Sequence, residues 1–159
     1  MIGFALFALF ASSCVAHVCL LAPMQRGGVN STALNTVGST SCFWLNGPCG
    51  TTTFRHPNIQ IRPASPFLVV FQKNQDHFYA SAPGSFSIDL ALERDPVESD
   101  FKVLATVADT ATPNGYVYTQ KVVLPIRRNI TDATLRVRYI TNNPMAPPVF
   151  YMCSSIAIY

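Results

Sequence analysis

The chain has 159 residues, which is long enough for one domain with a hydrophobic core and too short for two domains of ordinary size. Its formal charge of +3 is modest, so the charge balance does not point to a nucleic-acid partner. The sequence has no Gly-x-Ser-x-Gly elbow, no two-cysteine metal knuckle and no phosphate-binding glycine loop. Its eight carboxylates show no spacing that pairs them for acid-base hydrolysis, which argues against a glycosidase.

The first ten residues are almost wholly apolar and are followed by small residues, as in a secretory signal peptide. This apolar run is too short to span a bilayer. With Cys14 at position minus three and Ala16 at minus one, we expect a signal peptide over 1–16 and one domain over 17–159, which begins at His17. The start lacks the usual Lys or Arg, so a different cleavage site stays open. The mature protein is expected to be secreted and to have no membrane span.

Removal of the signal peptide leaves four cysteines in a chain that enters an oxidising compartment. Four cysteines allow three ways of forming two disulfides, and nothing in their spacing excludes any of the three. We favour the pairs Cys19–Cys42 and Cys49–Cys153.

Two further features bear on the compartment. Asn30 and Asn129 each begin an N-glycosylation triplet, which gives weak support for secretion. The chain ends at Tyr159 in a strand-like segment without the polar spacer and hydrophobic tail that direct a lipid anchor. We therefore expect free secretion, with lipid anchoring only if the sequence is truncated at its C-terminus.

Short segments that alternate apolar and polar residues, bounded by Pro, Gly and Asn, predict an antiparallel β-sandwich. The clearest strand is 85–93, in which Phe86, Ile88, Leu90 and Leu92 face one way and Ser87, Asp89 and Glu93 the other. Residues 23–66 are rich in Gly, Pro, Ser, Thr and Asn and predict a long loop region pinned by disulfides. The other expected strands are 67–71, 101–107, 116–124, 134–140 and 149–158.

The chain has three histidines, His17, His56 and His77, so a histidine site has few possible members. An N-terminal histidine can chelate a metal through its α-amine and its Nδ1, and a second imidazole opposite completes a plane of three nitrogens. Copper prefers this plane, whereas zinc prefers a tetrahedron. His77 lies in a loop between two predicted strands and is our candidate for the second imidazole. The alternative is that His17 follows the cleavage site by chance and that His77 is an ordinary surface histidine. We expect His56, between Arg55 and Pro57, to be a solvated loop residue.

Several short motifs together resemble the copper-acquisition-factor family, which is similar to lytic polysaccharide monooxygenases. The resemblance implies an immunoglobulin-like β-sandwich in which the amine and ring of His17 and the ring of His77 hold copper. It also implies copper binding without efficient polysaccharide oxidation. The motifs are His17-Val18-Cys19-Leu20-Leu21, Pro23-x-Gln25-Arg26-Gly27, Gly47-Pro48-Cys49-Gly50, the loop with His77, and Phe150-Tyr151-Met152-Cys153.

One position departs from that family. Its members usually carry an Asp two residues after the last cysteine, near the copper, and here this position is Ser155. The related oxidases place a Tyr or Phe near this axial position. Ser155 therefore predicts weaker or water-mediated axial ligation, for which Asp76, next to His77, could compensate.

These observations lead to one main hypothesis and two alternatives. The main hypothesis is an extracellular copper-binding protein that captures or hands over copper, with a copper transporter or a cell-surface protein as its partner. The first alternative is a copper-dependent polysaccharide monooxygenase, and the second is a copper-free structural or adhesion module.

Overall fold

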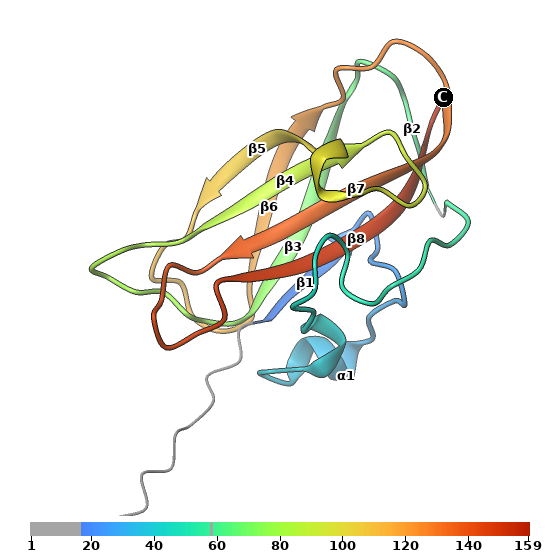
Figure 1. The fold of residues 1–159 in the computed structure, drawn as a ribbon. Helices are drawn as coiled ribbons and strands as arrows, with labels where there is room; N and C mark the ends of the chain where they lie inside the picture. Colours follow the sequence, from blue (N-terminus) through green and yellow to red (C-terminus); the bar gives the residue numbers. More distant parts are fainter. Residues whose placement is uncertain (1–16, 58) are drawn as a thin grey trace, which may run out of the picture.

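The computed structural model describes residues 17–57 and 59–159, so the expected signal peptide lies outside the described residues. The chain forms two packed β-sheets, with the connecting loop region along one side (Figure 1). One sheet has three strands in the order β1-β3-β6, and the other has five in the order β2-β8-β7-β4-β5. The strands are β1 (His17–Ala22), β2 (Gln60–Ile61), β3 (Pro66–Gln75), β4 (Ser85–Ala91), β5 (Lys102–Ala108), β6 (Tyr116–Val123), β7 (Ile130–Ile140) and β8 (Val149–Ile158).

This architecture confirms the expected all-β, immunoglobulin-like sandwich. All strand pairs are antiparallel except that of β2 with β8, which is parallel. Two strands were not expected, β1 and the two-residue β2. The first four residues of β1 are all buried, so β1 lacks the alternation that marks a strand with one wet face.

The core lies between the two sheets, and Phe86, Ile88 and Leu90, which the alternation in 85–93 predicted to face inward, belong to it. Phe86 and Ile88 of β4 are fully buried, as are Phe71 of β3 and Val137 of β7. The rings of Phe71 and Phe86 lie 5.0 Å apart, which joins the two sheets through an aromatic contact. Burial of each such side chain contributes roughly 1.5–3 kcal/mol to folding.

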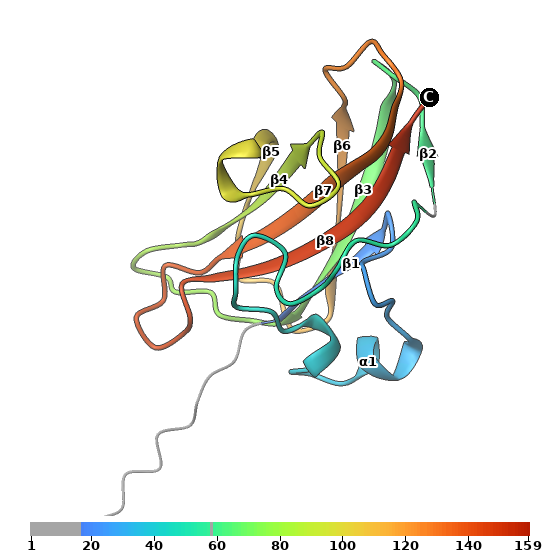
Figure 2. The same cartoon turned by 45° about the vertical axis from the view of Figure 1, so that its right-hand side comes forward.

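The segment between β1 and β2 is the long loop region that the composition predicted. It contains the short helix α1 (Ser31–Asn35), which Asn30 caps by accepting a hydrogen bond from the backbone N–H of Ala33 at 2.8 Å, and the single turn η1 (Thr40–Cys42). Figure 2 shows this segment alongside β1 and β8. Two disulfides attach it to the sheets, Cys19–Cys42 to β1 and Cys49–Cys153 to β8, and these are the pairs that we favoured.

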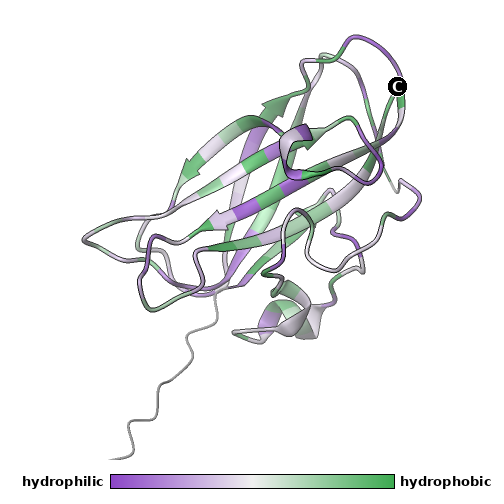
Figure 3. Cartoon of the chain, viewed as in Figure 1, coloured by the Kyte–Doolittle hydropathy of each residue, from purple (hydrophilic) through white to green (hydrophobic). Residues whose placement is uncertain are grey.

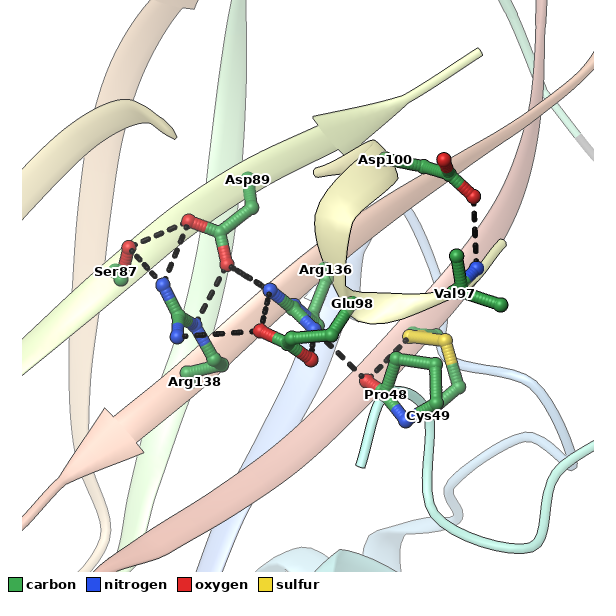
Figure 4. Close-up of polar contacts among 10 residues, drawn as sticks. Pro48, Cys49, Ser87, Asp89, Val97, Glu98, Asp100, Arg136 and Arg138 are labelled. Atoms are coloured by element: carbon green, nitrogen blue, oxygen red, sulfur yellow. Dashed lines mark hydrogen bonds and ion pairs between the residues drawn. A yellow bond between two sulfur atoms is a disulfide. The ribbon is translucent and has the colours of Figure 1, made fainter. Parts of the chain in front are cut away.

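The outer face of the five-stranded sheet differs from the prediction, because polar residues of β4 expected in solvent are buried. Asp89 is fully buried and accepts hydrogen bonds from Arg136 Nε at 3.0 Å and Arg138 Nε at 2.7 Å, both from β7 (Figure 4). Hydrophilic and hydrophobic segments alternate along β7 (Figure 3). The turn η2 (Glu98–Asp100) lies next to this ion pair, and Glu98 accepts two hydrogen bonds from Arg136, at 2.7 and 3.0 Å. The segment between β4 and β5 is thus attached to the outer face of the sheet through the buried charged side chain of Arg136.

We expect Asp89→Ala to lower the free energy of unfolding by about 3–5 kcal/mol, because it leaves two arginines without their buried carboxylate. Glu93→Ala is the matched control, since Glu93 is exposed and its carboxylate makes no ion pair in the described part of the chain. The control should stay within about 0.5 kcal/mol of the parent in urea unfolding. Equal losses in the two variants would show that the buried network does not stabilise the sheet.

Candidate metal site

His17 is the first residue of β1 and is 1% exposed. Its backbone is paired with that of Gln75 in β3, and its ring centroid lies 4.9 Å from that of Phe43. The chain also passes close to the His17 ring at Gly38, which has a φ of +75°. A Cβ at Gly38 would lie 2.8 Å from Gln75 Oε1 and 3.8 Å from His17 Cε1, so only glycine fits there. The His17 ring therefore contacts Phe43 and lies close to the turn at Gly38.

His77 follows the end of β3 by two residues, so strand register brings it to the same end of the sheet as His17. Both of its backbone groups are bonded. Its N–H donates to Tyr139 Oη at 3.2 Å, and its carbonyl accepts from Asn143 Nδ2 at 3.3 Å. The backbone of His77 is thus held by β7 and by the loop that follows it.

The side chain of His77 is 3% exposed, and its Nε2 has no hydrogen-bond partner. Among the residues that the structure describes, this is the one buried side-chain nitrogen or oxygen in that condition. An unpaired buried polar atom costs about 1–3 kcal/mol, and such atoms are rare without a functional reason. A nitrogen ligand for a metal fits this observation, because metal coordination would satisfy the lone pair of Nε2.

Two phenylalanines line the space next to the histidines. The ring of Phe150, on β8, lies 6.3 Å from that of His77 and 5.8 Å from that of Phe43, which in turn contacts His17. A chain of ring contacts thus runs from His17 through Phe43 and Phe150 to His77. Neither Phe43 nor Phe150 was expected at a metal site. Phe150 could have been considered from its sequence position, because it lies in the expected strand 149–158, three residues before Cys153.

The donor set is small. Among residues 17–57 and 59–159, no group of three or more His, Cys, Asp and Glu side chains is arranged to hold a metal ion. A metal site built on His17 and His77 would need a third ligand of another kind. The α-amine of His17, released by cleavage before it, would be such a ligand. An amine and two imidazoles are nitrogen donors, a set that suits copper.

A buried polar network supports the His77 backbone. The hydroxyl of Tyr139 donates to Asp109 Oδ2 at 2.6 Å, and Asp109 Oδ1 accepts from Lys73 Nζ at 3.0 Å. Burial raises the pKa of Tyr139, and its hydrogen bond to Asp109 raises it further. Burial by itself lowers the pKa of Lys73, but hydrogen bonds to Asp76 and Asp109 outweigh this effect and raise it. The network thus holds a charged lysine and a neutral tyrosine behind the loop.

Asp76 lies next to His77, but its carboxylate belongs to this network. Its Oδ1 accepts from Lys73 Nζ at 2.8 Å and from the backbone N–H of Phe78 at 2.9 Å. Asp76 therefore shapes the turn that carries His77, and its compensating axial role stays a prediction.

Ser155 is not brought to the histidines. It lies five residues further along β8 than Phe150, about 16 Å at the usual rise of a strand. Its Oγ accepts from Arg26 Nε at 3.0 Å and from the backbone N–H of Arg55 at 3.2 Å. This position gives no support to the axial role expected of residue 155, and Phe150 is the β8 side chain next to the candidate site.

The remaining predicted residues lie on the surface. His56 is exposed, as expected for a solvated loop residue. Asn30 and Asn129 are also exposed, so both predicted glycosylation acceptors are accessible, and the Nδ2 of Asn30 is not used by its helix cap. No helix in the described ranges has the length and apolar character needed to cross a membrane.

No protein-family profile and no curated protein sequence matches this chain. Its fold is similar to solved structures of lytic polysaccharide monooxygenases (LPMOs). One is an LPMO of the AA15 group from Thermobia domestica in the Cu(I) state, with a TM-score of 0.58, 18% identity, and coverage of 89% of this chain and 98% of that chain. Another is the catalytic domain of an LPMO from Listeria monocytogenes, with a TM-score of 0.54, 17% identity, and coverage of 90% and 99%. A third, the cellulose-active LPMO CelS2 in complex with copper, has a TM-score of 0.52, 17% identity, and coverage of 88% and 97%. At these identities the likeness shows a shared immunoglobulin-like sandwich.

We expect Tyr139→Phe to lower the free energy of unfolding by about 1–3 kcal/mol, because it keeps the ring but removes the hydroxyl that serves both His77 and Asp109. Urea unfolding measures this change. Tyr116→Phe is the control, since Tyr116 is half-exposed and its hydroxyl makes no hydrogen bond within the described residues. A loss no larger than that of the control would mean that the hydroxyl does not hold the His77 loop.

Proposed function

We propose that this chain is a secreted copper-binding protein that holds one copper ion through the His17 amine, the His17 imidazole and the His77 imidazole. The observation that carries the proposal is the buried Nε2 of His77, which has no partner within the described residues. The proposal is also supported by the position of His77, which lies at the same end of the sheet as His17, the first residue of β1. The role that we favour is capture or transfer of copper.

Each residue would contribute a specific property to this site. After cleavage, His17 would offer a neutral amine and a ring nitrogen that are joined by one side chain, so binding to both costs little extra ordering. Before cleavage the same backbone nitrogen is an amide and a poor ligand, so processing would create the site. His77 would supply its Nε2 from a loop that Tyr139 and Asn143 hold in place. Bound copper would supply a redox-active cation that prefers nitrogen ligands in a plane.

The extracellular location belongs to this proposal. It rests on the signal-like start of the sequence and on two disulfides, which persist in oxidising compartments. The accessible Asn30 and Asn129 are consistent with it.

A second candidate function is copper-dependent oxidation of a polysaccharide. It is favoured by the fold shared with LPMOs and by the exposed ring of Tyr79, two residues from His77, which could stack on a sugar. Incubation of the copper-loaded protein with chitin or cellulose and ascorbate separates the two functions. Oxidised oligosaccharides would show that the site turns over a substrate, whereas none are expected from a capture protein.

Copper at a hundred times its dissociation constant should stabilise the folded protein by about 2.7 kcal/mol. We expect this increment, measured by chemical unfolding with and without copper, to disappear in His17→Ala and in His77→Ala. His56→Ala is the matched control and should keep it. Isothermal titration that shows no binding tighter than micromolar would support the copper-free structural module instead. A copper response that survives both substitutions would remove His17 and His77 from the copper site.

The amine is tested separately by a variant that carries one extra alanine before His17 in the secreted protein. It retains both imidazoles but moves the free amine away from the chelate, so we expect copper affinity to fall by about a hundredfold or more. N-terminal sequencing of both secreted proteins establishes where each begins. Unchanged affinity would remove the amine from the site while leaving the imidazoles as candidate ligands.

A further inference from the structure

Arg26 carries a buried positive charge that has no carboxylate partner in the described part of the chain. It is 5% exposed, and it takes part in none of the ion pairs among the described residues. Buried charges in proteins are ordinarily paired, as Lys73 and Arg136 are in this molecule. The exception at Arg26 therefore needs an explanation.

Neutral oxygens hold the guanidinium in place. Its Nε donates to Ser155 Oγ at 3.0 Å, and its Nη2 donates to Thr134 Oγ1 at 2.7 Å and to the carbonyl of Arg94 at 3.3 Å. Ser155 and Thr134 are cross-strand neighbours on β8 and β7, so one edge of the guanidinium lies against the sheet. Two adjacent N–H groups of a guanidinium normally bind a carboxylate or phosphate through a pair of parallel hydrogen bonds. Here two hydroxyls occupy that place, and they carry no negative charge.

The other end of the guanidinium is open. Nη1 makes no hydrogen bond within the described residues, and it is not among their fully buried polar atoms without a partner, so it contacts accessible space. Arg26 lines a pocket of about 230 Å³ together with Arg55, His56 and Ser155. The pocket lining contains no Asp or Glu. Ser155 accepts two hydrogen bonds there and donates none within the described chain, so its hydroxyl proton is available to an acceptor.

The surrounding charge does not neutralise Arg26. Burial lowers the pKa of its guanidinium, and the charge of Asp95 offsets only part of this effect. The Asp95 side chain is 71% exposed and pairs with Arg94 at 3.8 Å, so it lies largely in solvent. The pocket thus combines a fixed cation, two further basic side chains and a free hydroxyl proton.

From this arrangement we infer that the pocket formed by Arg26, Arg55, His56 and Ser155 binds a single oxyanion group: a carboxylate, sulfate or phosphate. Arg26 Nη1 and the Ser155 hydroxyl donate to it from the buried side, and Arg55 and His56 enclose it from the exposed side. His17 begins β1, whereas residues 24–28, which line the pocket, follow the other end of this strand. The pocket is therefore separate from the candidate metal site. The group could belong to a small free anion or to an acidic polysaccharide.

The first test is titration of the chelator-treated, isotopically labelled secreted protein with sulfate, phosphate or glucuronate at constant ionic strength, followed by NMR. We expect saturable shifts of the Gly27 and Gly28 amides, which border the pocket. The double variant Arg55→Ala/His56→Ala should bind about tenfold more weakly or worse, because it removes exposed donors without disturbing the buried bonds. Arg128→Ala, an exposed arginine outside the pocket, should bind like the parent. Absence of saturable shifts at millimolar anion, or equal affinity in the double variant, would overturn the inference.

The second test adds the missing carboxylate. Ser155→Asp places an acceptor beside Arg26 Nε, so we expect a higher melting temperature without added anion and loss of the anion response. Ser155→Ala removes the hydroxyl but adds no charge, and it should be less stable and still gain stability from anion. An anion response in Ser155→Asp as large as in the parent protein would contradict the proposed site. Polygalacturonate and heparin are then compared with free anions, with neutral glycans as the control. If the acidic polysaccharides bind at least as tightly as the free anions, the group belongs to a polysaccharide. If only the free anions bind, the ligand is a small anion.

Discussion

The pairing of β1 with β3 is the constraint on which the rest of this structure depends. It places His17 opposite Gln75 and therefore beside the loop that carries His77. The Cys19–Cys42 disulfide attaches the same strand to the loop region that contributes Phe43. A shift of one residue would turn every β1 side chain to the opposite face and remove His17 from this position. The same strand leads at its other end to Arg26, so one short element determines both candidate sites.

The buried cations of this protein differ in whether a buried carboxylate pairs with them. Lys73 of β3 pairs with Asp109, which directly follows β5. Arg136 of β7 pairs with Asp89 of β4. Both carboxylates are fully buried. These pairs join elements that are distant in sequence, and they hold the His77 loop and the excursion between β4 and β5 against the sheets. Arg26 is satisfied on one edge by hydroxyls and a carbonyl, which leaves its charge unbalanced. The charges of Lys73 and Arg136 therefore stabilise the fold, whereas the charge of Arg26 could still be paired with a bound anion.

The candidate metal site combines a rigid support with an unsatisfied donor. The backbone of His77 is bonded on both sides, and the rings of Phe43 and Phe150 lie next to His17 and His77 respectively. Nε2 of His77 is buried and has no hydrogen-bond partner among the described residues. The fold is shared with LPMOs at less than 20% identity, and a shared fold does not by itself imply a shared function.

The sequence by itself predicted strands such as 85–93, because alternating apolar residues mark the face of a strand that packs against the core. It also determined the histidines available for a site, since there are only three, and the loop character of the segment that follows β1. It could not reveal β1, whose buried residues do not alternate, or the burial of Asp89, which requires the arginines of β7. Only the tertiary structure decided that Phe150 and not Ser155 lies by the histidines, because position along β8 relative to β7 is a long-range property. For the same reason the unpaired charge of Arg26 became visible only when residues 26, 134 and 155 were placed side by side.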